Sequence, residues 1–401
     1  MFLLLICSCK QKKTGETLVE IPEEIVEQKV LPPLEPGNVS YKNKNPFGAI
    51  IELTGTQLVD DSIVWKVSGT EMIVRNNQIV VYNFQQEPFM QFDLPDGKFI
   101  RYGNGRMGQG PDEFNFPRLV PTTDSMLLCY IFESTNQKLY QYLPTGEIIR
   151  YPFDLDASRR GRYSDKQIVN LAPDDFIYVE TSETGKSIFR TFRTGDSIST
   201  GEVFNLGLNP RRRSWSNYIG DFVVNPEQNR MAYAYKFFKI IKFMDLEAQT
   251  VRTVNFEREE FDESSNYVAD GLDNNVTHYW GACAGKDYVY FLYSGRTPVD
   301  VWRENNKKKY YIFVEKYDWN GNPVHTYKLD RWGYFCVDEK NNHIYIASTN
   351  EDDPFFGIVM YQDDKICESR HCEEERRSNP DQVDSLDCFV PRNDASSQFI
   401  S

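Results

Sequence analysis

The chain has 401 residues, a net charge of −14, and a composition that is 40% hydrophobic and 14% aromatic. This acidity excludes free nucleic acid as a partner and makes an anionic lipid surface a poor partner for the body of the protein. No run of 18 apolar residues occurs, so no transmembrane helix is expected. The abundance of tyrosine and phenylalanine favours an all-β fold, because these side chains suit a pleated, half-buried surface.

The first nine residues are similar to the end of a bacterial lipoprotein signal. An apolar run, Phe2–Ile6, is followed by Cys7, Ser8 and Cys9, and the small residue before Cys9 makes Cys9 the expected lipidation site. The apolar run is shorter than in a usual signal, so an upstream start codon and a chance apolar N-terminus both stay open. We expect a lipid-anchored protein of the cell envelope, with the anchor as its only membrane contact.

Residues 10–45 are rich in charge and proline and show little apolar periodicity, so they are predicted to be a flexible tether. Residues 367–401 are dense in charge without any alternation, and we predict that they are disordered. This C-terminal tail looks like translated non-coding sequence. Its Cys367, His371, Cys372 and Cys388 have no predicted element to hold a metal ion.

Six repeats organise residues 46–366, and two sequence markers that stay in phase define them. The first marker is a short β-rich run after a polar turn, and the second is an aromatic residue at the end of the next strand. The runs begin at Gln78, Ser125, Asp175, Arg230, Asp287 and His343, and the aromatics are Phe92, Tyr142, Phe192, Phe243, Tyr317 and Tyr361. A period near 50 residues is typical of four-stranded propeller blades, so a six-bladed β-propeller is predicted.

Two features depart from the regular repeat. The last repeat lacks its own outer strand, and the surplus strand Phe47–Leu53 at the N-terminus is expected to supply it and remove an exposed edge. The interval between Phe243 and Tyr317 is 74 residues, which predicts an insertion in blade five within residues 255–282.

The motif Gly108-Gln-Gly-Pro-Asp-Glu-Phe114 follows a strand and a glycine-rich turn. In this context it resembles the six-bladed, TolB-like propeller lipoproteins of Bacteroides-type bacteria, and the segment Tyr317-Asp-Trp-Asn-Gly321 is also similar. The resemblance covers about residues 47–364. It implies a six-bladed propeller and lipoprotein export, and no established activity. Asp112 departs from the family, which more often has glycine at that position.

Three loops are candidate ligand-binding elements. Glycines in the first expose N–H groups that can bind an anion, although a tight turn between blades also needs glycine. The second combines basic residues with a tryptophan, which suits a carboxylate, a sulfate or a sugar but also a solvated loop. The third is expected in the blade-five insertion and contains a histidine with an alternative structural role. The candidate residues are Gln109, Asp112, Glu113, Arg211, Arg212, Arg213, Trp215, His278 and Trp280.

No catalytic signature accompanies these loops. The chain has four histidines and no Gly-x-Ser-x-Gly elbow, and no pattern pairs two carboxylates or forms a calcium loop. The leading hypothesis is a monomeric, non-enzymatic binding or scaffolding lipoprotein without a cofactor. It would bind a peptide, a glycan or an envelope protein on the loop face or at the channel mouth. The rival hypothesis is a hydrolase or lyase that uses channel carboxylates, with or without a metal ion.

Overall fold

The structure is a computed structural model that describes residues 31–42, 44–58, 63–67, 69–110, 113–155, 167–183, 185–209, 215–256, 275–349, 351 and 354–360. The expected lipidation site Cys9, most of the expected tether and the C-terminal tail lie outside these residues. No helix in the described part of the chain is long and apolar enough to cross a membrane.

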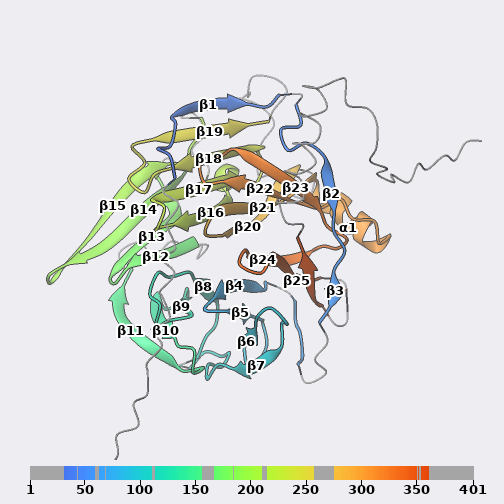
Figure 1. Ribbon diagram of the computed structural model, residues 1–401. Coiled ribbons are helices and arrows are strands. Elements are labelled where there is room, and N and C mark those ends of the chain that lie inside the picture. Colours follow the sequence, from blue (N-terminus) through green and yellow to red (C-terminus); the bar gives the residue numbers. More distant parts are fainter. Residues whose placement is uncertain are drawn as a thin grey trace, which may run out of the picture. The chain divides into compact units, whose positions relative to one another are not determined.

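Six sheets form the six blades of a β-propeller (Figure 1). Blade one contains β4 (Glu71–Arg75), β5 (Gln78–Tyr82), β6 (Phe89–Asp93) and β7 (Phe99–Tyr102). Blade two contains β8 (Pro117–Val120), β9 (Cys129–Glu133), β10 (Lys138–Tyr142) and β11 (Ile148–Asp154). Blade three contains β12 (Gln167–Ala172), β13 (Asp175–Ser182), β14 (Gly185–Thr194) and β15 (Ser197–Asn205).

The other three sheets each include a strand from the N-terminal part of the chain. Blade four contains β16 (Gly220–Asn225), β17 (Arg230–Tyr235), β18 (Ile240–Met244), β19 (Val251–Asn255) and β1 (Gly37–Ser40). Blade five contains β20 (Thr277–Ala284), β21 (Tyr288–Arg296), β22 (Phe313–Asp318), β23 (Pro323–Lys328) and β2 (Ile50–Glu52). Blade six contains β24 (Gly333–Asp338), β25 (His343–Ser348), β26 (Phe355–Val359) and β3 (Thr56–Gln57).

The first strand of each blade is the inner strand. The inner strands β4, β8, β12, β16, β20 and β24 each contact the next in this order, and β24 contacts β4. Figure 1 shows them around a common centre, with the later strands of each blade farther out. The described residues also contain one 3-10 helix, η1 (Trp215–Tyr218), and one short α-helix, α1 (Pro298–Asn306), each between two strands.

The two sequence markers correctly predicted the strand order. The β-rich runs supply the second strands of the blades, β5, β9, β13, β17, β21 and β25, and these strands are almost completely buried. The aromatics of the second marker lie on the third strands β6, β10, β14, β18 and β22, while Tyr361 lies outside the described residues. Aromatic side chains from adjacent blades pack together, so the apolar cores lie between the sheets.

Closure by an N-terminal strand is confirmed, but Phe47–Leu53 was the wrong strand. The strand β3 pairs antiparallel with β26 and completes blade six. Within Phe47–Leu53, β2 instead pairs in parallel with β23 as a fifth strand of blade five. The closing strand has only a threonine and a glutamine, and its pairing uses backbone groups, so no hydrophobic pattern signals it.

Part of the expected tether is also a strand. Residues Gly37–Ser40 form β1, which pairs in parallel with β19 at the outer edge of blade four. The hydrogen bond from Tyr41 N to Asn255 O, 2.9 Å long, extends this pairing. The propeller sheets therefore begin before residue 46.

The long blade-five interval contains a helix that the sequence pattern did not predict. The helix α1 lies between β21 and β22, and Thr297 caps its N-terminus by accepting a 3.1 Å hydrogen bond from Asp300 N. Pro298 occupies the first turn, where no N–H donor is needed. The extra length of the interval is thus divided between the β19–β20 connection and α1.

A buried ion pair joins blades four and five. The Lys239 ammonium lies 3.3 Å from the Glu315 carboxylate and 3.9 Å from the centre of the Tyr293 ring. The hydroxyls of Tyr279 and Tyr317 donate to the same carboxylate at 3.2 and 2.8 Å. Burial opposes the charge of Lys239, but Glu315 and Tyr293 together outweigh burial and raise the lysine pKa. The pair therefore links two blades, and two tyrosine hydroxyls hydrogen-bond to its carboxylate.

Candidate functional site

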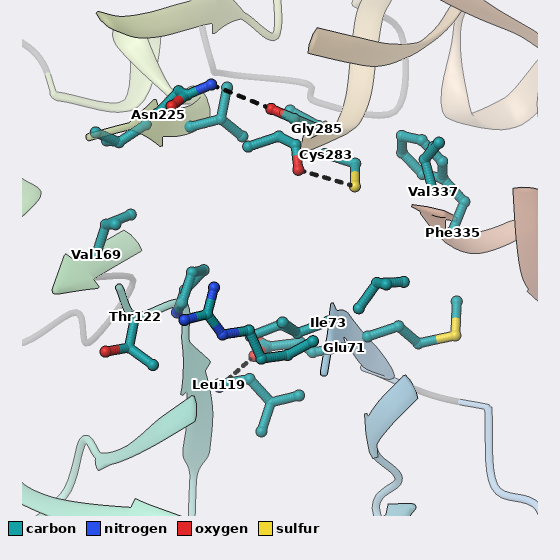
Figure 2. Close-up of a pocket in the computed structure, with 18 of the residues that line it drawn as sticks. Glu71, Ile73, Leu119, Thr122, Val169, Asn225, Cys283, Gly285, Phe335 and Val337 are labelled. Atoms are coloured by element: carbon teal, nitrogen blue, oxygen red, sulfur yellow. Dashed lines mark hydrogen bonds between the residues drawn. The ribbon is translucent and has the colours of Figure 1, made fainter. Parts of the chain in front are cut away.

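The candidate site is a cavity of about 720 Å³ at the centre of the ring. All six inner strands contribute side chains to its wall, so its width is set by the closure of the propeller. Figure 2 shows labelled side chains from several blades directed toward one open space. The volume is within the range of sites that bind small organic ligands.

The middle of the cavity is an apolar belt. It comes from apolar side chains on the inner strands of blades one, two, three, five and six. Figure 2 shows these side chains around the open space. The belt residues are Ile73, Leu119, Val169, Cys283, Phe335 and Val337. Burial raises the pKa of the Cys283 thiol to about 12, so this cysteine is a neutral part of the belt at pH 7.

Polar side chains at the beginnings of four inner strands, together with Trp280 in the middle of β20, form a charged rim, which we define as Glu71, Arg118, Gln167, Asp221 and Trp280. Arg118 Nε lies 2.5 Å from Glu71 Oε1, and Glu71 Oε2 accepts a 2.7 Å hydrogen bond from Leu119 N. Burial raises the pKa of Glu71, and the positive charge of Arg118 opposes this shift. The pair links the inner strands of blades one and two.

Gln167 makes the equivalent link between blades three and four. Its Nε2 donates to Gly220 O at 3.0 Å, and its Oε1 accepts from Phe222 N at 2.7 Å. Both bonds go to the backbone of the neighbouring inner strand. The charged rim is therefore preorganised by contacts that do not depend on a ligand.

Asp221 is the second acid of the charged rim whose pKa is perturbed. Burial raises its pKa to about 6, although Lys236, Lys186 and Arg118 favour the charged form. Asp221 is the second residue of β16, and its side chain is only partly exposed. A carboxyl that titrates near neutral pH inside a cavity is typical of functional sites.

The ends of the inner strands form a second, polar rim held by hydrogen bonds between blades. Arg75 donates to Thr123 O at 3.0 Å, and the Asn225 amide donates to Gly285 O and Lys286 O at 3.3 and 2.8 Å. Figure 2 shows the Asn225–Gly285 bond at the edge of the cavity. These contacts tie blade one to blade two and blade four to blade five.

The Gly108–Phe114 loop supports its own turn and does not line the cavity. Glu113 folds back to accept a 2.8 Å hydrogen bond from Gly110 N, and a Cβ at Gly108 would collide with its carboxylate. Phe114 is buried against Phe89 with ring centres 5.1 Å apart. Gln109 is exposed at the tip. The glycines of this loop are therefore explained by the tight turn that they form, without an anion.

His278 and Trp280 lie on β20, so their expected position in an insertion loop was wrong. The strand holds them through its pairing with β21 and through the bond from His278 N to Lys236 O, 2.7 Å long. Burial, aided by Lys239, lowers the pKa of His278 to about 3, so its ring is neutral. Trp280 lines the cavity, with the Lys236 ammonium 5.6 Å from its ring centre.

For the remaining candidate residues from the sequence, the structure describes no contact with the cavity. Asp112 and Arg211, Arg212 and Arg213 lie outside the described residues, as does the side chain of Trp215, whose backbone belongs to η1. Within the described ranges, no three His, Cys, Asp or Glu side chains are grouped closely enough to hold a metal ion.

Sequence reasoning missed Glu71, Arg118, Gln167 and Asp221. A usable signal was present for two of them, because Glu71 and Arg118 each precede the start of a β-rich run by seven residues. Trp280 has the same spacing from Asp287. The same spacing in three blades therefore marks one position of the charged rim, although a different residue type occupies it in each blade.

A family model described as TolB-like 6-blade propeller-like matches residues 167–340, from blade three into blade six. The chain is also similar to a solved DUF4221 family member from Bacteroides vulgatus, with 12% identity and a TM-score of 0.51, over 78% of this chain and 97% of that one. A Bacteroides fragilis protein whose export has been proposed matches with 13% identity and a TM-score of 0.49, over 81% and 100% of the two chains. No curated protein matches the chain. At these identities the similarity to solved structures shows the fold alone, and that fold is a six-bladed β-propeller.

Proposed function

We propose that the protein is a non-enzymatic binding protein of the cell envelope that holds part of a glycan or peptide in its central cavity. The observation that carries this proposal is the cavity of about 720 Å³ with an apolar belt between two polar rims. Ligand sites combine a largely apolar wall with a few fixed polar groups that orient the ligand.

The chemistry of the charged rim suits a ligand with both apolar and hydroxyl or amide groups. Trp280 of the charged rim lines the cavity, as does Tyr334 on the next blade outside this rim, and both offer aromatic surface. Asp221 and Arg118 add a carboxylate and a guanidinium, which hydrogen-bond to hydroxyl and amide groups. The Glu71–Arg118 pair and the hydrogen bonds of Gln167 hold part of the charged rim in place before binding, which reduces the entropy lost on association.

A thermal-shift screen of the full chain against short peptides and oligosaccharides tests the proposal. A ligand that binds only the folded state raises the melting temperature. Ile73→Trp, which places a large ring in the belt, should abolish the shift, while Ile149→Trp on exposed β11 should preserve it. An equal shift in both variants would place the ligand outside the cavity.

The second candidate function is a hydrolase or lyase, and one observation favours it. Glu71 and Asp221 line the same cavity, and burial raises the pKa of both. A carboxyl with a pKa of about 6, as Asp221 has, can act as a general acid near neutral pH. Once a ligand is known, chromatography of the ligand after incubation decides the question. Turnover that is lost in Asp221→Asn supports an enzyme, and an unchanged ligand supports the binding protein.

Placement in the envelope is supported by the apolar run Phe2–Ile6 before Cys9. The test is incorporation of radiolabelled palmitate by the chain in a Bacteroides host. Label that is lost in Cys9→Ala and kept in Cys7→Ala identifies the anchor. Label that survives both changes contradicts the assignment.

A further inference from the structure

The helix α1 and the residues after it form a basic, aromatic surface on an acidic protein. Residues 296–311 contain five basic and two acidic residues, although the whole chain has a net charge of −14. We define the α1 patch as the exposed residues Trp302, Arg303, Lys307, Lys308, Lys309 and Tyr311. Trp302 is 65% exposed and Tyr311 is 40% exposed. Two exposed aromatic rings beside four basic side chains form one contiguous surface, which is more informative than a single exposed ring.

The fold presents the α1 patch rigidly. Val301 is buried against the neighbouring core, so Trp302, the next residue, faces solvent. The Thr297 cap fixes the start of α1, and Lys309 N donates to Glu304 O at 3.0 Å just after its end. The lysines therefore project from an ordered turn and not from a free loop.

The positive charge of the α1 patch is not neutralised locally. Asp300 lies 3.6 Å from Arg303, and Glu304 lies 3.4 Å from Arg296, so both acids of the segment already pair with arginines. Among the described residues, no acidic side chain forms an ion pair with Lys307, Lys308 or Lys309. The three lysines thus remain available to an external anion.

We propose that the α1 patch binds the surface of an anionic phospholipid membrane. Exposed tryptophan and tyrosine prefer the headgroup region, where the ring is apolar and its N–H or O–H stays hydrated. Clustered lysines, here in the turn that follows α1, are attracted to anionic headgroups. The rest of the acidic surface is repelled by the same membrane, so only this part of blade five approaches it.

This interaction is independent of ligand binding in the cavity and of a lipid on Cys9. It revises the expectation that an anchor is the only membrane contact, because the charge argument for the whole chain does not describe this local surface. A lipid chain and a basic patch together hold a protein on a membrane more firmly than either alone.

The test is co-sedimentation of the full chain carrying Cys7→Ala and Cys9→Ala, which removes any lipid anchor. The probes are phosphatidylcholine vesicles with increasing phosphatidylglycerol. We expect binding that rises with phosphatidylglycerol and falls with added salt. Each lysine near such a surface contributes about fivefold in affinity, so the triple change Lys307→Glu, Lys308→Glu and Lys309→Glu should weaken binding on the order of a hundredfold or more.

A matched control changes three other exposed lysines, Lys44, Lys66 and Lys98, to glutamate. It alters the net charge equally and should keep most of the binding. Trp302→Ser should weaken binding without changing its dependence on salt. The proposal is overturned if the unmodified patch does not bind anionic vesicles, if neutral vesicles bind as well, or if the two triple variants lose binding equally. Equal melting temperatures of the variants exclude unfolding as the cause.

Discussion

Replacing Asp221 by asparagine should stabilise the protein at neutral pH. Folding raises the pKa of this carboxyl from 3.8 to about 6, chiefly because burial disfavours its charged form. When the aspartate is ionised in both the folded and the unfolded state, this shift costs about 3 kcal/mol of folding free energy. Solvent screening of the partly exposed side chain lowers the expected gain from Asp221→Asn to about 1–3 kcal/mol.

The pH dependence follows from the direction of the shift. A raised carboxyl pKa means that the folded state holds the proton more tightly, so the stability of the unmodified protein falls as pH rises from about 4 to about 6. Above pH 6 the advantage of Asp221→Asn is complete, and at pH 4 it is largely gone. Urea unfolding of both proteins at each pH measures this difference.

The exposed Asp196 provides the matched control, since Asp196→Asn removes the same charge from a solvent-exposed position. Its effect should stay within about 0.5 kcal/mol at every pH. If Asp221→Asn is no more stable than the unmodified protein at pH 8, or if its advantage does not change between pH 4 and pH 8, burial of the Asp221 charge is not the cause of its shift.

Three further changes test the packing of the ring by urea unfolding. Lys239→Met should cost about 3 kcal/mol of stability, because it leaves the Glu315 carboxylate buried without its cation. Adding Glu315→Leu should recover part of that loss. If the free-energy changes of the two substitutions simply add, the residues are not a coupled pair. Gly108→Ala should cost about 1 kcal/mol, because the Glu113 carboxylate must turn away and lose its hydrogen bond from Gly110 N. Gly201→Ala, with open space around its Cβ position, should not; equal effects would show that this hydrogen bond adds no stability. Replacing both residues of β3 by proline removes its ladder donors and should lower the unfolding midpoint; an unchanged midpoint would show that closure adds no stability.

Repetition made most of the fold predictable from sequence. The second strands, such as β5 and β17, are apolar on both faces because they lie between two other blades, and they stand out as short β-rich runs. The third strands end in an aromatic before a hairpin turn, which gives a second signal in the same phase. Neither signal depends on knowing how the blades contact one another.

The edges of the sheets were less predictable because their pairing is made by the backbone. The closing strand β3 contains no apolar residue, and β1 lies in a stretch with little apolar periodicity. The helix α1 is short, and its amphipathic pattern has one fully buried position, Val301. Local patterns of this kind carry too little information to distinguish a strand or helix from a loop.

The candidate site was only partly accessible to sequence reasoning. Motif searching selected the Gly108–Phe114 loop, whose unusual composition reflects the turn that Glu113 closes. The charged rim instead consists of unremarkable residues that only the ring assembles. Burial in the ring raises the pKa of Asp221, and Lys236 from its own blade, Lys186 from blade three and Arg118 from blade two oppose that shift. No spacing in the sequence predicts such a grouping, although the blade period does align Glu71, Arg118 and Trp280.

The order in which β1, β2 and β3 join their sheets has a mechanical consequence. A pulling force applied to the chain before Gly37 reaches the β1–β19 pair first, then β2–β23, and only then the β3–β26 pair that closes the ring. The first two strand pairs protect the closing pair from the force, since each must separate before the force reaches the closing strand. A protein held from its N-terminus could therefore lose two edge strands under tension and still keep its six blades joined.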